Sequence, residues 1–84
     1  MFIAEIRITL KEGVLDPQGT AVQKALHAME YSEVRSVRIG KYMEISLEGT
    51  DRETAAAEVE EMCRRLLANP VIEEYTFEIR EVER

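Results

Sequence analysis

Two side chains of this sequence have the chemistry of a nucleophile and its general base: the single cysteine, Cys63, and the single histidine, His27. A thiolate beside an imidazole can attack a carbonyl carbon. Both residues, however, fall within segments predicted to be helical, and their spacing gives no reason for them to meet. We interpret Cys63 as a small buried apolar residue and His27 as a surface residue of its helix. We therefore predict no catalytic residue in this chain.

Metal and phosphate sites need ligand clusters or loops that the sequence does not contain. A zinc site needs several Cys or His ligands at close spacing. Gly13 and Gly19 match neither GxGxxG nor GxxxxGK[ST], and Gly40-Lys41 is only a dipeptide. Carboxylates are abundant, but no pair stands out as an acid and a base. We predict no metal ligand and no cofactor in this chain.

The length of 84 residues allows a single domain, which we place at residues 1–84. Against 11 basic residues stand 17 acidic ones, and the net charge of -6 disfavours a general nucleic-acid binder. No apolar run approaches the ~20 residues that span a bilayer, so we expect no membrane contact. With one cysteine and no signal-peptide pattern, we expect a cytoplasmic protein. Because a domain of this length buries only a small hydrophobic core, we expect it to assemble with other chains.

The elements that position these residues follow from the apolar periodicity. Residues 2–10 alternate apolar and polar side chains, which predicts a strand with one buried face. Asp16 is a strong helix cap, and Pro17 loses no intrahelical hydrogen bond at the first helical position. These two residues predict a helix over 17–30.

An apolar row over residues 37–47 is interrupted by Gly40-Lys41. This pattern predicts two short strands, near 34–40 and 42–48, joined by a tight turn at the dipeptide. One bent strand is the alternative, because a glycine there can equally mark a bulge.

A second helix is predicted between Thr50 and Asn69-Pro70. Thr50 and Glu53 have the spacing of a capping box, with the hydroxyl as N-cap, and the apolar stripe includes Val59, Cys63 and Leu66. A final strand is predicted over 71–80, with residues 81–84 frayed.

The order of elements predicts an α+β fold, a ferredoxin-like βαββαβ sandwich. Its four-stranded antiparallel sheet would carry both helices on one face. The other face would be polar and of mixed charge, either solvated or a surface for self-association or a partner. Its predicted members are Glu5, Arg7, Thr9, Ser36, Arg38, Glu44, Ser46, Glu74, Thr76, Glu78 and Arg80.

Three stretches carry a resemblance to a known family: LKEGVLDPQG at 10–19, VRIGK at 37–41 and LLANPVIEEY at 66–75. In this order they resemble the PurS family, the small subunits of the multi-subunit phosphoribosylformylglycinamidine synthase of purine biosynthesis. The resemblance covers essentially the whole chain. It implies the ferredoxin-like topology, a homodimer or higher homo-oligomer, and a non-catalytic assembly subunit of an ATP-dependent carbon–nitrogen ligase complex.

The resemblance also implies partners and a reaction. A glutaminase subunit would release ammonia from glutamine, and a large synthetase subunit would use it to convert formylglycinamide ribonucleotide to formylglycinamidine ribonucleotide. ATP and magnesium would bind the synthetase, and this chain would bridge the two subunits and support ammonia transfer.

Four residues are predicted to contact other chains: Gln18, Arg38, Lys41 and Tyr75. Arg35, Arg38 and Lys41 are the only charged residues between Glu33 and Glu44, and this basic patch is either ordinary surface charge or a contact for an acidic partner. Tyr75 is included because a tyrosine side chain can bury a large apolar area in an interface while its hydroxyl forms a hydrogen bond.

Two other functions share this topology. A small-ligand-binding regulatory module would need a glycine-rich turn after the first strand, where Gly13 alone gives poor support. An acylphosphatase-like hydrolase would need a phosphate-cradling loop with an arginine, and Lys11-Glu12-Gly13 does not provide one.

Overall fold

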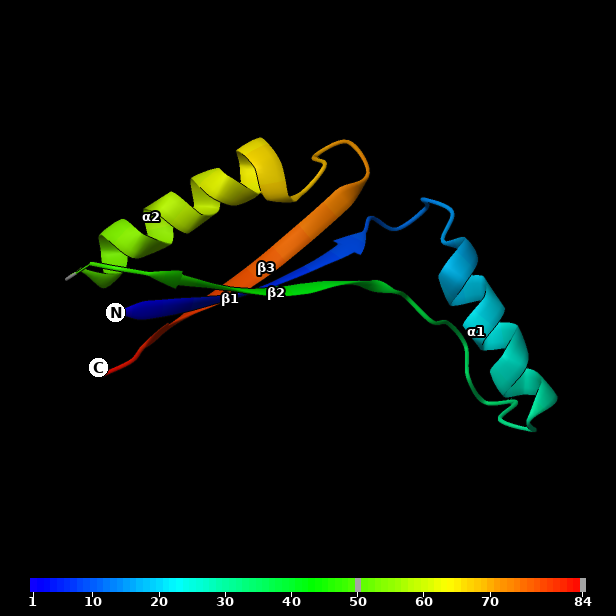
Figure 1. The fold of residues 1–84 in the computed structure, drawn as a ribbon. Helices are drawn as coiled ribbons and strands as arrows, with labels where there is room; N and C mark the ends of the chain where they lie inside the picture. Colours follow the sequence, from blue (N-terminus) through cyan, green and yellow to red (C-terminus); the bar gives the residue numbers. More distant parts are fainter. Residues whose placement is uncertain (50, 84) are drawn as a thin grey trace.

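A computed structural model describes residues 1–49 and 51–83 and confirms an α+β fold (Figure 1). The predicted elements form near their predicted positions, except for the strand near 34–40. In chain order these are β1 (Phe2–Leu10), α1 (Pro17–Ala28), β2 (Gly40–Leu47), α2 (Arg52–Met62), its π-helical extension η1 (Cys63–Leu67) and β3 (Glu73–Glu81).

The sheet has the strand order β2-β1-β3, and both pairings are antiparallel. Ile6 of β1 lies opposite Met43 of β2 on one side and Phe77 of β3 on the other. Since residues that face each other across an antiparallel pair share a sheet face, the apolar positions of all three strands gather on one side.

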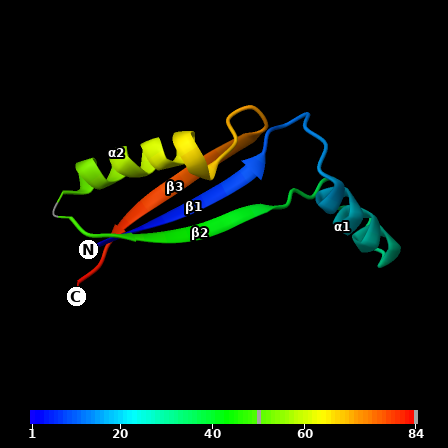
Figure 2. The same ribbon diagram turned by 45° about the horizontal axis from the view of Figure 1, so that its top comes forward.

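The core lies between β1 and the α2–η1 helix (Figure 2). Ala4, Ile6 and Ile8 of β1 are completely buried, as are Val59 and Cys63 of the helix. The prediction of Cys63 as a buried apolar residue is confirmed. Burial, with a smaller contribution from the charge of Glu60, raises the pKa of this thiol, which keeps it protonated and unreactive.

The predicted hairpin at Gly40-Lys41 is wrong. Gly40 and Lys41 are the first residues of β2 and pair with Thr9 and Ile8 of β1. Among the described residues the sheet therefore has three strands rather than four, because residues 34–39 run on from β2 as an unpaired extension. A β-carbon at Gly40 would clash with the carbonyl oxygen of Ile8, so glycine is needed for the close approach of the two strands.

The prediction that both helices cover one sheet face is also wrong within this chain. Only α2 lies over the sheet, whereas α1 extends beyond the strand ends (Figures 1 and 2). Val22 and Met29, two apolar residues of α1, are 40% and 64% exposed. The physical reason is that α1 packs against the extended segment 34–39 and not against the strands. Gln23 Nε2 donates to the Arg35 carbonyl oxygen at 2.9 Å, and His27 Nε2 lies 2.7 Å from the Val34 carbonyl oxygen.

The second helix is capped by Asp51, whose side chain accepts a hydrogen bond from the Thr54 amide at 3.2 Å. The predicted cap, Thr50, lies outside the described residues, as does Arg84 of the predicted frayed end. The helix ends before Asn69-Pro70 as predicted. Its last turn widens into η1, and Leu66, predicted to lie in the apolar stripe, is 81% exposed.

No helix of the described residues is long and apolar enough to cross a membrane.

The assignment of the core predicts that replacing valine by alanine lowers the free energy of unfolding by different amounts at Val59 and Val71. Val59→Ala should lower the free energy of unfolding by roughly 2 kcal/mol, because it removes two buried methyl groups. Val71→Ala, at a side chain 78% exposed, should change it by less than about 0.5 kcal/mol. Urea unfolding at one fixed protein concentration measures both, and equal effects would contradict this core.

Candidate functional site

A hollow of about 290 Å³ lies where β1 ends and where α1 and β2 begin. Two of the four predicted contact residues, Gln18 and Lys41, line it together with Asp16 and Glu73. The site thus combines an amide, an ammonium group and two carboxylates at one end of the sheet.

Asp16 joins the two chain segments that connect α1 to the sheet. Its Oδ1 accepts a hydrogen bond from the Gly19 amide at 2.9 Å, which confirms the predicted helix cap. Its Oδ2 accepts a second from the Ile39 amide, also at 2.9 Å. The hydrogen bond from Ile39, that from Gly19 and the charge of Arg38 lower the pKa of Asp16, because all three favour the ionised carboxylate.

Arg38 lies just outside the hollow, and its guanidinium is already bound within the chain. Its Nη2 donates to Thr9 Oγ1 at 3.0 Å, to the Leu10 carbonyl oxygen and to Glu74 Oε1 at 2.8 Å. Arg38 therefore ties segment 34–39 to the end of β1 and the start of β3. Its predicted contact with another chain remains a prediction.

Lys41 and Gln18 have more exposed side chains. Lys41 Nζ lies 3.6 Å from Glu73 Oε2, and its side chain is 58% exposed. Gln18 is exposed in the first turn of α1. Both residues are accessible to another molecule at this end of the sheet.

Tyr75 is placed differently from the other three residues. It shares a second hollow, of about 410 Å³, with Arg38, but its hydroxyl donates to Glu60 Oε1 of α2 at 2.7 Å. That hydrogen bond is the main reason the pKa of Tyr75 is raised. Because odd-numbered residues of β3 face the helix, Tyr75 belongs mainly to the margin of the core.

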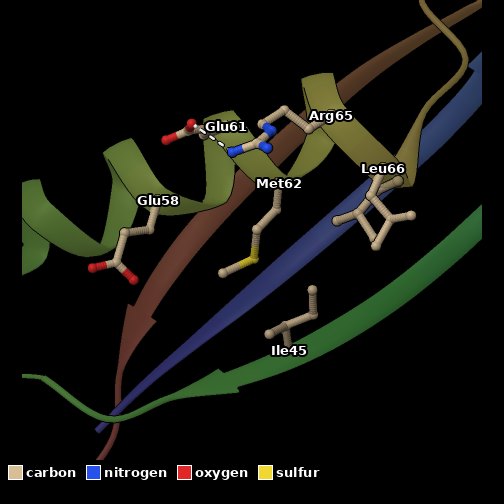
Figure 3. A pocket seen from close by; sticks show the side chains of 7 residues that line it. Ile45, Glu58, Glu61, Met62, Arg65 and Leu66 are labelled. Carbon is tan, nitrogen blue, oxygen red and sulfur yellow. Dashed lines mark hydrogen bonds and ion pairs between the residues drawn. The ribbon is translucent and has the colours of Figure 1, made fainter.

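A larger groove, of about 600 Å³, lies between α2 and β2 (Figure 3). Its apolar surface consists of Ile45 of β2 with Met62, Leu66 and Leu67 of the helix. Its charged lining consists of Glu58, Glu61 and Arg65, and the last two form an ion pair at 3.2 Å. The sequence pattern placed Leu66 in the apolar stripe of the helix, so it did not indicate an open groove.

The polar sheet face is a network of opposite charges. Arg7 lies 4.0 Å from Glu78, and Arg80 lies 4.0 Å from Glu5. The Tyr42 hydroxyl donates to Glu5 at 3.2 Å and to Glu44 at 3.0 Å. Desolvation, followed by these two hydrogen bonds, raises the pKa of Tyr42 to about 12, so the phenol remains a donor that separates two facing carboxylates.

Among the described residues, no group of three or more His, Cys, Asp or Glu side chains could hold a metal ion. His27 and Cys63 lie on different elements, and His27 Nε2 lies 2.7 Å from the Val34 carbonyl oxygen. The charged hollow and the apolar groove are suited to contacts with other protein chains.

The sequence is similar to known proteins over almost the entire chain. The family model for PurS, phosphoribosylformylglycinamidine (FGAM) synthase, matches residues 3–81. The Bacillus subtilis phosphoribosylformylglycinamidine synthase subunit PurS is 56% identical over 82 residues, which cover 98% of this chain and 96% of that protein.

Two solved structures extend this likeness to three dimensions. Methanocaldococcus jannaschii PurS, a subunit of formylglycinamide ribonucleotide amidotransferase, is 41% identical with a TM-score of 0.86 and covers 99% of this chain and 100% of its own. A chain of PurLQS from Thermotoga maritima is 33% identical with a TM-score of 0.81 and covers 96% of both chains. The likeness therefore extends over nearly the full length of the fold.

The double role of Asp16 predicts the effect of Asp16→Asn. Asparagine offers one acceptor oxygen where aspartate offers two, so the amide of Ile39 or Gly19 must lose its partner. Hydrogen exchange at one of these amides should accelerate roughly tenfold or more. Asp51→Asn, which alters the cap of α2, is the matched control and should leave both amides unchanged.

The same variant predicts a pH dependence. A carboxylate with a lowered pKa stabilises the fold above its unfolded-state pKa, and this stabilisation disappears as the pH falls through the folded-state value. The difference in urea midpoint between wild type and Asp16→Asn should therefore be full at neutral pH and shrink below about pH 4. A difference that grows on acidification would contradict the geometry.

Proposed function

This chain belongs to the PurS family of phosphoribosylformylglycinamidine synthase subunits, and from this premise we propose that it joins the glutaminase and synthetase subunits into one enzyme. The observation that carries the proposal is a match over the whole chain to PurS proteins, one of them solved within PurLQS. In the synthase of purine biosynthesis, the PurS chain is thus the assembly subunit, and the larger chains perform the chemistry.

The proposed reaction divides between the partners. The glutaminase releases ammonia from glutamine, and the synthetase uses ATP and magnesium to activate formylglycinamide ribonucleotide and accept the ammonia as formylglycinamidine ribonucleotide. Free ammonia would be protonated or diluted in bulk water. An assembly that holds the two active sites together shields it and raises its effective concentration.

Surface chemistry supports a bridging role for this chain. Its two sheet faces differ, since one carries paired charges and the other an apolar groove beside α2. Charged and apolar surfaces on opposite sides allow two different partners to bind simultaneously. The exposed Lys41 and Gln18 are the proposed partner contacts, while Arg38 ties the segment between α1 and β2 to the end of β1 and the start of β3.

Reconstitution tests the proposed function directly. The chain is mixed with purified synthetase and glutaminase subunits, and product formation is measured with glutamine and, separately, with ammonium salt. We expect glutamine-dependent synthesis to require the chain and ammonia-dependent synthesis to proceed without it. If the chain changes neither complex formation nor glutamine-dependent synthesis, the proposal is wrong.

Charge reversal at Lys41 tests the contact residues. Lys41→Glu should weaken binding to the partner subunits roughly tenfold, because it places a carboxylate beside Glu73 and against an acidic partner surface. Lys24→Glu, on the exposed surface of α1, makes the same change in net charge and should bind normally. Calorimetry measures the affinity of each variant for the partner subunits, and circular dichroism verifies that each is folded. Equal affinities of the two variants would refute the assignment of Lys41.

A further inference from the structure

The polar face of the sheet carries a hollow of about 410 Å³, formed by parts of β1, β3 and the segment before β2. In the sheet, Arg7 lies opposite Thr76 and Thr9 lies opposite Glu74, so these four side chains form two neighbouring rows on one face. Arg38 reaches the same place from segment 34–39. The hollow thus brings two guanidinium groups and two hydroxyl groups near one another.

Arg7 is held in place without a close acceptor for its protons. Its guanidinium carbon lies 5.5 Å from the centroid of the Tyr42 ring, which is a cation–π arrangement. Its Nη1 lies 4.0 Å from Glu78 Oε1, which is too far for a hydrogen bond. The guanidinium donates no hydrogen bond to any residue that the structure describes, and the side chain is 54% exposed. Its five N–H donors are therefore available to an acceptor.

Arg38 and Thr9 add further donors to the hollow. The three hydrogen bonds of the Arg38 side chain all use Nη2, so the protons of Nη1 and Nε remain available. Thr9 Oγ1 accepts one of these bonds, which leaves its own hydroxyl proton to be donated. Among the described lining residues the one carboxylate is Glu74, and it already accepts from Arg38 at 2.8 Å. The hollow therefore has an excess of donors and lacks an anionic acceptor.

The charges around the hollow favour a carboxylate over a phosphate. The described polar face carries Arg7, Arg38 and Arg80 against Glu5, Glu44, Glu74 and Glu78, and the net charge of the chain is -6. A phosphate dianion would be repelled by this negative field more strongly than a carboxylate with a single charge. The two oxygens of a carboxylate also match the planar fork of an arginine side chain.

The open shape of the hollow favours a protein ligand over a small molecule. A small ligand is bound where most of its surface is buried, whereas Arg7 and Arg38 lie on a sheet face with side chains 54% and 45% exposed. A carboxylate on a protein needs no enclosure by this chain, because the rest of the interface covers it. The hollow also shares Thr9 with the hollow of Lys41 and Gln18, so one partner can cover both.

We propose that this hollow binds an acidic side chain, aspartate or glutamate, of a partner subunit. The partner carboxylate accepts hydrogen bonds from the free guanidinium of Arg7 and from the remaining donors of Arg38, and the hydroxyls of Thr9 and Thr76 hold its oxygens. The proposal rests on the proposed function, because the partner is one of the two larger subunits. It adds the polar sheet face to the contacts at the end of the sheet.

Arg7→Ala tests the site. Calorimetry measures the affinity of each variant for the synthetase and, separately, for the glutaminase. Arg7→Ala should weaken binding to one of them roughly tenfold or more, because it leaves the partner carboxylate without its main counter-charge. Arg7→Lys keeps the charge but not the planar fork, and should lie between wild type and Arg7→Ala. Circular dichroism verifies that each variant is folded.

Arg64→Ala is the matched control. Arg64 lies in η1, on the helix side of the sheet, where it forms an ion pair with Glu60 at 3.9 Å and its side chain is 63% exposed. The substitution makes the same change in net charge as Arg7→Ala and should leave both affinities at the wild-type value. Equal affinities of Arg7→Ala and Arg64→Ala for both subunits would overturn the site.

Two measurements on the isolated chain separate the partner side chain from other occupants. Sodium glutamate at millimolar concentration should cause no saturable shift of the Arg7 and Thr76 amide resonances. A saturable shift that Arg7→Ala abolishes would assign the hollow to a small carboxylate instead. Sedimentation should give wild type and Arg7→Ala the same oligomeric state, and a difference would assign the hollow to a second copy of this chain. Either result would overturn the proposal.

Reconstitution separates failure of this site from failure of the proposed function. If the wild-type chain assembles the enzyme and Arg7→Ala binds both subunits with unchanged affinity, the assembly role stands and only the site is refuted. If the wild-type chain binds neither subunit, the proposed function and the site are both wrong.

Discussion

One helix cannot cover three strands, and most of the structure follows from this constraint. A helix with its side chains is about 10 Å wide, whereas three strands at about 4.8 Å spacing present a wider apolar face. Helix α2 covers β1 and β3, so Ala4, Ile6 and Ile8 are completely buried. Met43, Ile45 and Leu47 of β2 are only half-buried. The open groove, the exposed Leu66 and the placement of α1 away from the sheet are all parts of this one imbalance.

The identity of each element was predictable from local sequence. Strand β1 follows from strict alternation, and the start of α1 from Asp16-Pro17, because the forces involved act over a few residues. The path of the chain after α1 was not predictable. The alternation of apolar and polar residues over 37–47 is compatible with a hairpin and with a continuous strand. Only the close packing of Gly40 against Ile8 of the neighbouring strand decides between them.

The candidate site was predictable in part for the same reason. Lys41 and Gln18 were chosen for their chemistry, and the fold brings them to one hollow. Tyr75 was grouped with them, although its position in the strand alternation assigns it to the helix side. The bond between Asp16 and Ile39 spans 23 residues, and no local pattern signals a contact at that separation. Arg38 likewise donates hydrogen bonds to Thr9 of β1 and Glu74 of β3. Both partners are distant in the sequence, and only the folded chain brings them to Arg38.

The complete burial of Cys63 has a practical consequence. Its thiol is covered by β1 on one side and by its own helix on the other, and its raised pKa keeps the reactive thiolate scarce. An alkylating reagent can reach it only when the helix lifts from the sheet. The rate at which the thiol is labelled in the native protein therefore reports how often the core opens, and no added probe is needed.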